Sequence, residues 1–183
     1  IRVKFCGICG TDIHILDGTA KARPPLIPGH EYSGIVEDVG GDIKAFKKGD
    51  RVSVNPNIHC GKCHFCRHGM IHLCENNRAL GVHLNGGFSE YSIIPESQAY
   101  LLPENISMKW GSMIEPLSCC IHGADLAEIK TGDSVLIIGA GAIGLMMIQL
   151  AKISGADKII VIEKDRSRKN IAELYEIDTA LNP

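Results

Sequence analysis

The hydrophobic and polar positions along the chain divide it into two parts with different periodicity. Up to about residue 120, short apolar runs alternate with Gly, Pro, Asn and Asp, and they cover residues 33–40, 50–54, 88–94 and 99–103. Apolar runs of this length bounded by turn residues are typical of β-strands joined by turns. The first part is therefore predicted to be rich in β-strands.

From about residue 125 the apolar runs become longer and follow a different order. The continuous run at 133–139 predicts a strand of a parallel sheet buried on both faces. Residues 142–154 carry apolar side chains at helical spacing and precede a glycine, which predicts a helix. The apolar positions that define this helix are Ile143, Met147, Leu150 and Ala151.

A second strand and a second helix follow in the same order. Residues 158–163 form another apolar run, and residues 165–177 read as a helix with Asp165 as its N-cap. Residues 178–183 are expected to begin a third strand. On the second helix, one face is predicted to hold Ile171, Leu174 and Tyr175.

The alternation of strand and helix indicates the opening of a doubly wound parallel sheet. We therefore predict a β-rich domain over residues 1–124 and the start of a nucleotide-binding domain over 125–183. Two strands and two helices do not make a stable open sheet by themselves. The sequence is accordingly expected to be a fragment of a protein of about twice its length, truncated at both ends.

Composition and charge narrow the class of protein. Hydrophobic residues make up 45% of the chain and charged residues 22%, as in ordinary globular proteins. A net charge of −2 gives no reason to expect nucleic acid as a partner. No apolar run is long enough to span a membrane. The 8 cysteines fit a secreted disulfide scaffold poorly, because long apolar segments accompany them, and we expect a reducing, cytoplasmic location.

Four cysteines lie within one short stretch at residues 59–75: Cys60, Cys63, Cys66 and Cys74. Four thiolates around tetrahedral zinc form the usual closed structural site. Such a site has no open position and is rich in electrons, so we assign it to stability and not to catalysis. Two disulfides or an iron–sulfur cluster are the alternatives.

A second set of metal-ligand residues is dispersed along the chain. The segments CGICGTDIH at 6–14 and PGHEYSG at 28–34 offer Cys9, His30 and Glu31 beside glycine turns, and Glu115 can complete or relay this set. Catalytic zinc requires mixed ligands and an open position. The alternatives are a redox pair at CGIC, as in thioredoxin, and a core histidine at His30.

The third motif is GAGAIG, a G-x-G-x-x-G sequence between the first predicted strand and helix of the second part. With an acidic residue after the next strand, this setting is the dinucleotide-binding fingerprint. The first glycine permits the tight turn, the second permits approach of the pyrophosphate, and the third permits close helix packing. The candidate cofactor-binding residues are Gly139, Gly141, Ala142, Ile143, Gly144 and Glu163.

Glu163 is expected to accept hydrogen bonds from the adenosine ribose and to favour NAD over NADP. This preference is opposed by three cations that follow closely and can hold a phosphate: Lys164, Arg166 and Arg168. The alternative for the whole motif is a glycine-rich packing turn that binds no nucleotide.

Taken in order, these motifs resemble the zinc-containing medium-chain dehydrogenase/reductase superfamily, most closely its sorbitol or polyol and threonine dehydrogenase branches. CGICGTDIH, PGHEYSGIV, GGFSEY and IEPLSCCIHG all match its patterns, and the resemblance covers essentially the whole chain. It implies a mixed α+β and α/β fold. A GroES-like catalytic domain without its first strands would be followed by the first half of a Rossmann sheet.

The resemblance also implies roles for single residues. Cys9 and His30 match the catalytic zinc ligands, with Glu31 as the neighbouring acid and Glu115 as a ligand or a holder of the zinc-bound water. Thr11 matches the residue that takes the substrate proton. His14 matches the end of a proton relay, and Arg168 matches a contact to the ribose. A glutamate at position 115 counts against an animal-type alcohol dehydrogenase site.

The expected activity is oxidation of a small secondary alcohol, a polyol or sugar alcohol, to a ketone, with NAD and two zinc ions per subunit. The alternative within this class is L-threonine 3-dehydrogenase or another secondary-alcohol dehydrogenase. A non-catalytic nucleotide-binding scaffold and a zinc-ribbon binding module are alternatives of other classes. The resemblance also implies a homo-oligomer, either a dimer or a tetramer.

Overall fold

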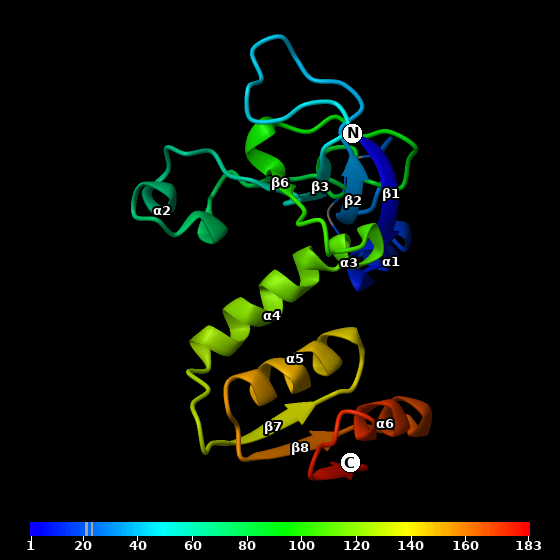
Figure 1. The fold of residues 1–183 in the computed structure, drawn as a ribbon, viewed down its shortest axis with the longest axis vertical. Helices are drawn as coiled ribbons and strands as arrows, with labels where there is room; N and C mark the ends of the chain where they lie inside the picture. Colours follow the sequence, from blue (N-terminus) through cyan, green and yellow to red (C-terminus); the bar gives the residue numbers. More distant parts are fainter. Residues whose placement is uncertain (21, 23) are drawn as a thin grey trace. The chain divides into compact units, whose positions relative to one another are not determined.

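The computed structural model describes residues 1–20, 22 and 24–183. The chain forms two compact units, Ile1–Glu115 and Pro116–Pro183 (Figure 1). Along this described part of the chain, no helix combines the length and the apolar character needed to cross a membrane.

The first unit is built on an antiparallel sheet in the order β1-β2-β3-β6. Its strands are β1 (Arg2–Gly7), β2 (Glu31–Ile35), β3 (Arg51–Val54) and β6 (Ala99–Leu101). The strands predicted at 50–54 and 99–103 are confirmed, and the one predicted at 33–40 is confirmed only in part, because β2 ends at Ile35. Tyr32, Val54 and Leu80 are the buried centre of this unit's core.

Short helices interrupt the strands of the first unit, and the apolar pattern did not reveal them. They are α1 (Gly10–Leu16), α2 (His64–Arg67), α3 (Met108–Gly111) and the 3₁₀ helices η1 (Ile71–Leu73) and η2 (Glu96–Gln98). The two-residue strands β4 (Asn57–Ile58) and β5 (Arg78–Ala79) pair with each other. The segment between them, which carries α2, extends away from the four-stranded sheet (Figure 1).

No strand forms over residues 88–94 as predicted. In the described residues this segment makes one bridge, between Tyr91 and Arg2, with hydrogen bonds from Val3 N–H to the Glu90 carbonyl and from Ser92 N–H to the Ile1 carbonyl, both 2.9 Å. The residues at the start of this segment and just before it bond to another loop. The backbone N–H groups of Gly86, Gly87 and Phe88 donate to carbonyl oxygens of residues 27–29 at 2.7, 2.8 and 3.0 Å. Residues 86–88 therefore fix the position of the loop that leads into β2.

The second unit contains the predicted parallel sheet, in the order β7-β8-β9. Its elements are the helix α4 (Ile114–Leu126), which begins just before the unit, followed by β7 (Ser134–Ile138), α5 (Ala142–Ile153), β8 (Lys158–Ile162), α6 (Arg166–Glu173) and β9 (Thr179–Leu181). Asp165 caps α6 as predicted, since its side chain accepts from the backbone N–H of Arg168 at 3.0 Å. The fold class expected for this part is confirmed.

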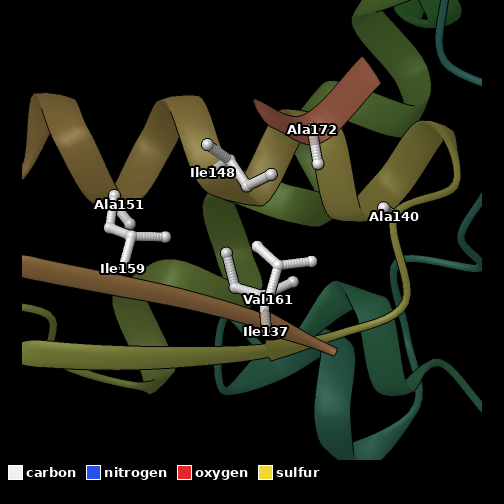
Figure 2. Packing of buried hydrophobic residues seen from close by; sticks show 7 residues of the cluster. All are labelled: Ile137, Ala140, Ile148, Ala151, Ile159, Val161 and Ala172. Atoms are coloured by element: carbon white, nitrogen blue, oxygen red, sulfur yellow. The ribbon is translucent and has the colours of Figure 1, made fainter. Parts of the chain in front are cut away.

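The core of the second unit lies between α5 and one face of the sheet. Ile137, Ile159 and Val161 point from the strands toward Ile148 and Ala151 of α5 (Figure 2). Burial of β7 on both faces was predicted. In the described residues one face is buried, whereas Leu136 and Ile138 on the other face are 56% and 78% exposed. Side chains alternate along a strand, and α5 covers only one of the two faces.

The apolar stripes predicted on the two helices are confirmed only in part. On α5, Ala151 is buried and Met147 packs against the core, whereas Ile143 is 52% exposed. On α6, Tyr175 packs against the core, whereas Ile171 and Leu174 are exposed and Ala172 is the buried residue. Spacing alone identifies an apolar stripe, but the small alanine is the residue that permits α6 to approach the core closely.

Candidate metal and cofactor sites

The four cysteines of the 60–74 stretch meet in one place. One sulfur atom from each of Cys60, Cys63, Cys66 and Cys74 lies within 4.8 Å of the other three. A tetrahedral zinc with Zn–S bonds of about 2.3 Å needs its sulfurs about 3.8 Å apart, so the cluster fits such an ion. Helix α2 begins directly after Cys63 and contains Cys66, and the backbone N–H of Cys60 donates to the Cys74 sulfur at 3.2 Å.

Backbone donors prepare part of this cluster for a cation. The N–H groups of Lys62 and Cys63 lower the pKa of Cys60 to about 6. Donors from Cys66 and Glu75 lower the pKa of Cys63, whereas burial raises the pKa of Cys66 to about 12. Four adjacent thiols do not all ionise without a positive charge between them. The arrangement is that of a closed, thiolate-rich metal site.

The dispersed candidates also come together. One ligand atom from each of Cys9, His30 and Glu31 lies within 4.8 Å of the other two. Cys9 directly precedes α1, and the other two stand at the start of β2. Gly29 permits this arrangement through its φ of +90°, and a Cβ there would lie 2.8 Å from the Cys6 sulfur.

The Glu31 carboxylate depends on a glycine in the neighbouring strand. Gly7 of β1 pairs with Glu31 of β2, and a Cβ on Gly7 would lie 2.3 Å from Glu31 Oε2. The register of the two strands thus leaves the carboxylate just enough room on this side.

Asp12 is a central residue of this site that the sequence reasoning missed. Only 6% of Asp12 is exposed, and its carboxylate accepts from the N–H groups of Cys9 and Gly29 at 2.8 and 3.1 Å. It also lies 3.6 Å from Nδ1 of His30, a buried atom without a hydrogen-bond partner in the described residues. A capping-box spacing after Cys9 was the available signal, since Asp12 occupies the third position of α1.

The remaining residues of the CGICGTDIH segment differ in their surroundings. The half-buried Thr11 places its hydroxyl oxygen 3.7 Å from the Cys9 sulfur. His14 is exposed in the last turn of α1. Burial, followed by the nearby charge of Asp12, raises the pKa of Cys6 to about 12. Cys6 is therefore a protonated thiol, which argues against the redox-pair alternative for CGIC.

Glu115 stands in the first turn of α4. The group of three ligand residues within 4.8 Å, as far as the described chain shows it, comprises Cys9, His30 and Glu31 and does not include Glu115. Its membership in a ligand set therefore stays a prediction.

The three glycines of GAGAIG have different surroundings. Gly139 has a φ of +98°, and a Cβ on Gly144 would lie 1.9 Å from the Gly139 carbonyl oxygen. These two positions require glycine for conformation and packing. A Cβ on Gly141 would meet nothing closer than Arg168, at 3.9 Å. Gly141 thus leaves open space before the N-terminus of α5, where a phosphate can approach.

Glu163 lies at the end of β8 and faces this loop. It is 6% exposed, and its two oxygens accept from the N–H groups of Ala140 and Asp165 at 2.7 and 2.8 Å. These two backbone donors keep the pKa of the Glu163 carboxyl below its usual value. The ribose contact expected from the sequence therefore has to use the lone pairs that remain.

The chain belongs to the alcohol dehydrogenase GroES-like domain family, whose sequence pattern matches residues 1–104. Together with the relatives described next, this match confirms the resemblance to the zinc-containing medium-chain dehydrogenase/reductase superfamily. The expected GroES-like and partial Rossmann fold is confirmed as well. The domain limits of 1–124 and 125–183, the cytoplasmic location and the assembly into a dimer or tetramer stay predictions.

Several relatives are similar over the whole chain. L-threonine 3-dehydrogenase of Pyrococcus furiosus is 40% identical, with 100% of this chain aligned to 53% of that protein. D-arabinitol dehydrogenase 1 of Uromyces fabae is 40% identical, with 94% aligned to 49%. A solved structure of a dehydrogenase described as zinc-binding, from Sinorhizobium meliloti 1021 with NADP, is 41% identical with a TM-score of 0.97, and the match covers 100% of this chain and 53% of that one. The chain thus spans about half the length of these relatives.

Proposed function

We propose that the whole protein is a zinc-dependent dehydrogenase that oxidises a secondary alcohol, a polyol or sugar alcohol, to a ketone with NAD. The observation that carries this proposal is the convergence of Cys9, His30 and Glu31 within 4.8 Å. A thiolate, an imidazole and a carboxylate form the kind of mixed donor set found at catalytic zinc, and a fourth position remains for substrate.

The residues of the chain fit two zinc ions per subunit. Cys9, His30 and Glu31, with Glu115 as a further or exchanging acid, would hold the catalytic ion. The cluster at 60–74 would hold the structural one. Bound zinc supplies a Lewis acid that acidifies the substrate hydroxyl, and the nicotinamide supplies the hydride acceptor.

The protein's own residues orient the substrate and move its proton. The Thr11 hydroxyl would accept the proton of a substrate hydroxyl bound at the ligand group, and its distance of 3.7 Å from the Cys9 sulfur supports this role. His14 follows one turn later on α1 and is exposed, so it can exchange that proton with solvent. Positioned proton transfer of this kind contributes about 10²- to 10⁴-fold to a rate.

The loop at 139–144 would bind the cofactor pyrophosphate at the start of α5, with Gly141 providing the open approach. The carboxylate of Glu163, beside this loop, favours the ribose hydroxyls of NAD over the phosphate of NADP. Arg168, which matches the ribose contact, has its Nη1 3.9 Å from the position that a Cβ on Gly141 would take. Because one similar dehydrogenase was solved with NADP, the affinities of this protein for NAD and NADP have to be measured side by side.

Threonine is the competing substrate, because a threonine dehydrogenase and an arabinitol dehydrogenase are equally similar to this chain at 40% identity. We propose the polyol on the acid-rich ligand set. Initial rates of the whole protein with polyols, L-threonine and simple alcohols, each with NAD and NADP, decide between them. A higher kcat/KM for threonine than for every polyol would refute the polyol assignment.

The metal assignment has its own test in Cys9→Ser. We expect this variant to lose turnover and one of two zinc ions, while the cluster at Cys60–Cys74 keeps its metal. Elemental analysis and initial rates measure both. Full activity with one zinc remaining would refute the assignment, and an unreactive wild-type protein that still binds NAD would support the scaffold alternative.

A further inference from the structure

A small hydrogen-bonded group surrounds His14 at the C-terminal end of α1. It consists of His14, Asp17, which caps the helix, and Thr19 in the turn that follows. The Thr19 hydroxyl lies 2.6 Å from Asp17 Oδ1 and 3.1 Å from His14 Nδ1. The second oxygen of Asp17 lies 3.7 Å from the same ring nitrogen. All these contacts are on the Nδ1 side of the imidazole.

The position of each hydrogen follows from the chemistry of the three groups. An ionised carboxylate only accepts hydrogen bonds, so the short contact to Asp17 uses the single hydrogen of the Thr19 hydroxyl. In the described residues, the other acceptor within reach of that hydroxyl is the His14 carbonyl oxygen, at 3.4 Å. It is farther away and already accepts from the Ala20 N–H at 2.8 Å.

The Thr19 oxygen is therefore left as an acceptor toward His14, and Nδ1 of His14 must be the donor. In a neutral imidazole that carries its hydrogen on Nδ1, Nε2 has the free lone pair. The Thr19 hydroxyl and backbone N–H keep the pKa of Asp17 below its usual value, so the chain of donors ends on a negative charge.

We propose that Thr19 and Asp17 are positioning residues that fix His14 in the Nδ1–H tautomer, with Nε2 as the atom that takes up the substrate proton. This inference rests on the proposed function of His14 as the end of the proton relay. When Nε2 accepts the proton, both ring nitrogens carry hydrogen, and the carboxylate of Asp17 stabilises the cation. Nε2 then releases the proton to water, and the Nδ1–H tautomer is restored.

The surroundings permit this cycle. The side chains of His14 and Asp17 are 64% and 47% exposed, so water reaches the ring. Across the described part of the chain, Asp17 is the carboxylate within ion-pair distance of His14. His14 and Asp17 thus form an acid–base pair that is bridged by the Thr19 hydroxyl.

The tautomer can be read directly from ring-¹⁵N histidine in the whole, zinc-loaded protein, by long-range proton–nitrogen correlation at a pH where imidazole is neutral. His14→Gln assigns the signal. We expect the wild-type protein to show a protonated Nδ1 and a pyridine-like Nε2. In Thr19→Val the tautomer ratio should move toward Nε2–H about fivefold, as expected for the loss of one hydrogen bond. Thr19→Ser should keep the wild-type ratio.

Kinetics then connect the tautomer with turnover. We expect Thr19→Val to lower kcat about fivefold at unchanged KM, because proton uptake and not binding is impaired. Asp42→Asn, at an exposed carboxylate elsewhere in the first unit, is the matched control and should change neither readout.

A wild-type His14 protonated on Nε2, or a ratio that Thr19→Val leaves unchanged, would overturn the inference. A changed ratio with unchanged kcat would overturn the role in proton transfer. If the wild-type protein oxidises no alcohol, the proposed function fails, and the tautomer measurement still decides the assignment of the hydrogens.

Discussion

The two groups of metal-ligand residues are assembled in different ways. The four cysteines come from one stretch, residues 60–74, and a short helix and two turns bring them together. Cys9, His30 and Glu31 come from two segments about 20 residues apart, which the pairing of β1 with β2 brings together. The first group depends on local spacing, and the second depends on the register of a sheet.

The donor atoms of the two groups also differ. Four thiolates compensate the charge of zinc more than fully and leave no open position, which suits a structural ion. The mixed group would leave a bound zinc ion electrophilic, and the buried carboxylate of Asp12 lies 3.6 Å from Nδ1 of His30. Substitutions in the two groups should therefore separate stability from activity.

The largest effect is expected for Cys63→Ser in the four-cysteine cluster. Structural zinc contributes about 10–16 kcal/mol to the folding of isolated zinc-finger peptides. If only about 3 kcal/mol of this is lost here, Tm should fall by about 6–12 °C. Thermal unfolding and zinc content measure the effect. The exposed His59 of the same stretch provides the control, since His59→Ala should leave both unchanged.

Asp12→Asn tests the support of the mixed group. Residues that orient a ligating histidine typically contribute 10–100-fold to metal affinity or activity, and we expect a loss of that order. Competition with a chelator measures zinc affinity at each site. Zinc should bind more weakly at the site of Cys9, His30 and Glu31 and with unchanged affinity at the four-cysteine cluster. Equal weakening of both would contradict the separation of the two groups.

A third comparison lies within the glycine loop. Gly144→Ala places a methyl group 1.9 Å from a carbonyl oxygen and should cost about 1–3 kcal/mol of stability. Gly141→Ala meets no atom closer than 3.9 Å, so stability should change by less than about 0.5 kcal/mol while NAD binds more weakly. Denaturation and NAD titration of both variants distinguish packing from binding. If Gly141→Ala bound NAD with wild-type affinity, the result would support the alternative that this loop is a packing turn that binds no nucleotide.

The smallest effect concerns Glu163 and pH. Its pKa in the folded protein lies below the usual 4.5 because two backbone N–H groups bond the ionised form. The resulting stability is present above pH 4.5 and is lost as the pH falls through the lower, folded value. Glu163→Gln should therefore lower Tm slightly at pH 7, and the difference from wild type should shrink in acid. A difference that grows on acidification would contradict this.

The sequence revealed those features that depend on neighbouring residues. The cysteine spacing, the strand before GAGAIG and the cap at Asp165 are local, and all three form as expected. The segment predicted as a strand at 88–94 instead follows hydrogen bonds to the loop before β2 and then bridges β1 at Tyr91, contacts that no local pattern shows. Asp12 was missed for a similar reason. Its contact with His30 exists only once α1 and β2 are folded together.

The short ladder of β4 and β5 has a consequence for how this protein can vary. Asn57 pairs with Ala79 and Ile58 with Arg78, so the two ends of the cysteine-bearing excursion leave and re-enter the main body side by side. Lengthening a loop whose ends are already joined costs little chain entropy. This segment can therefore become longer or shorter while the register of the four-stranded sheet stays unchanged.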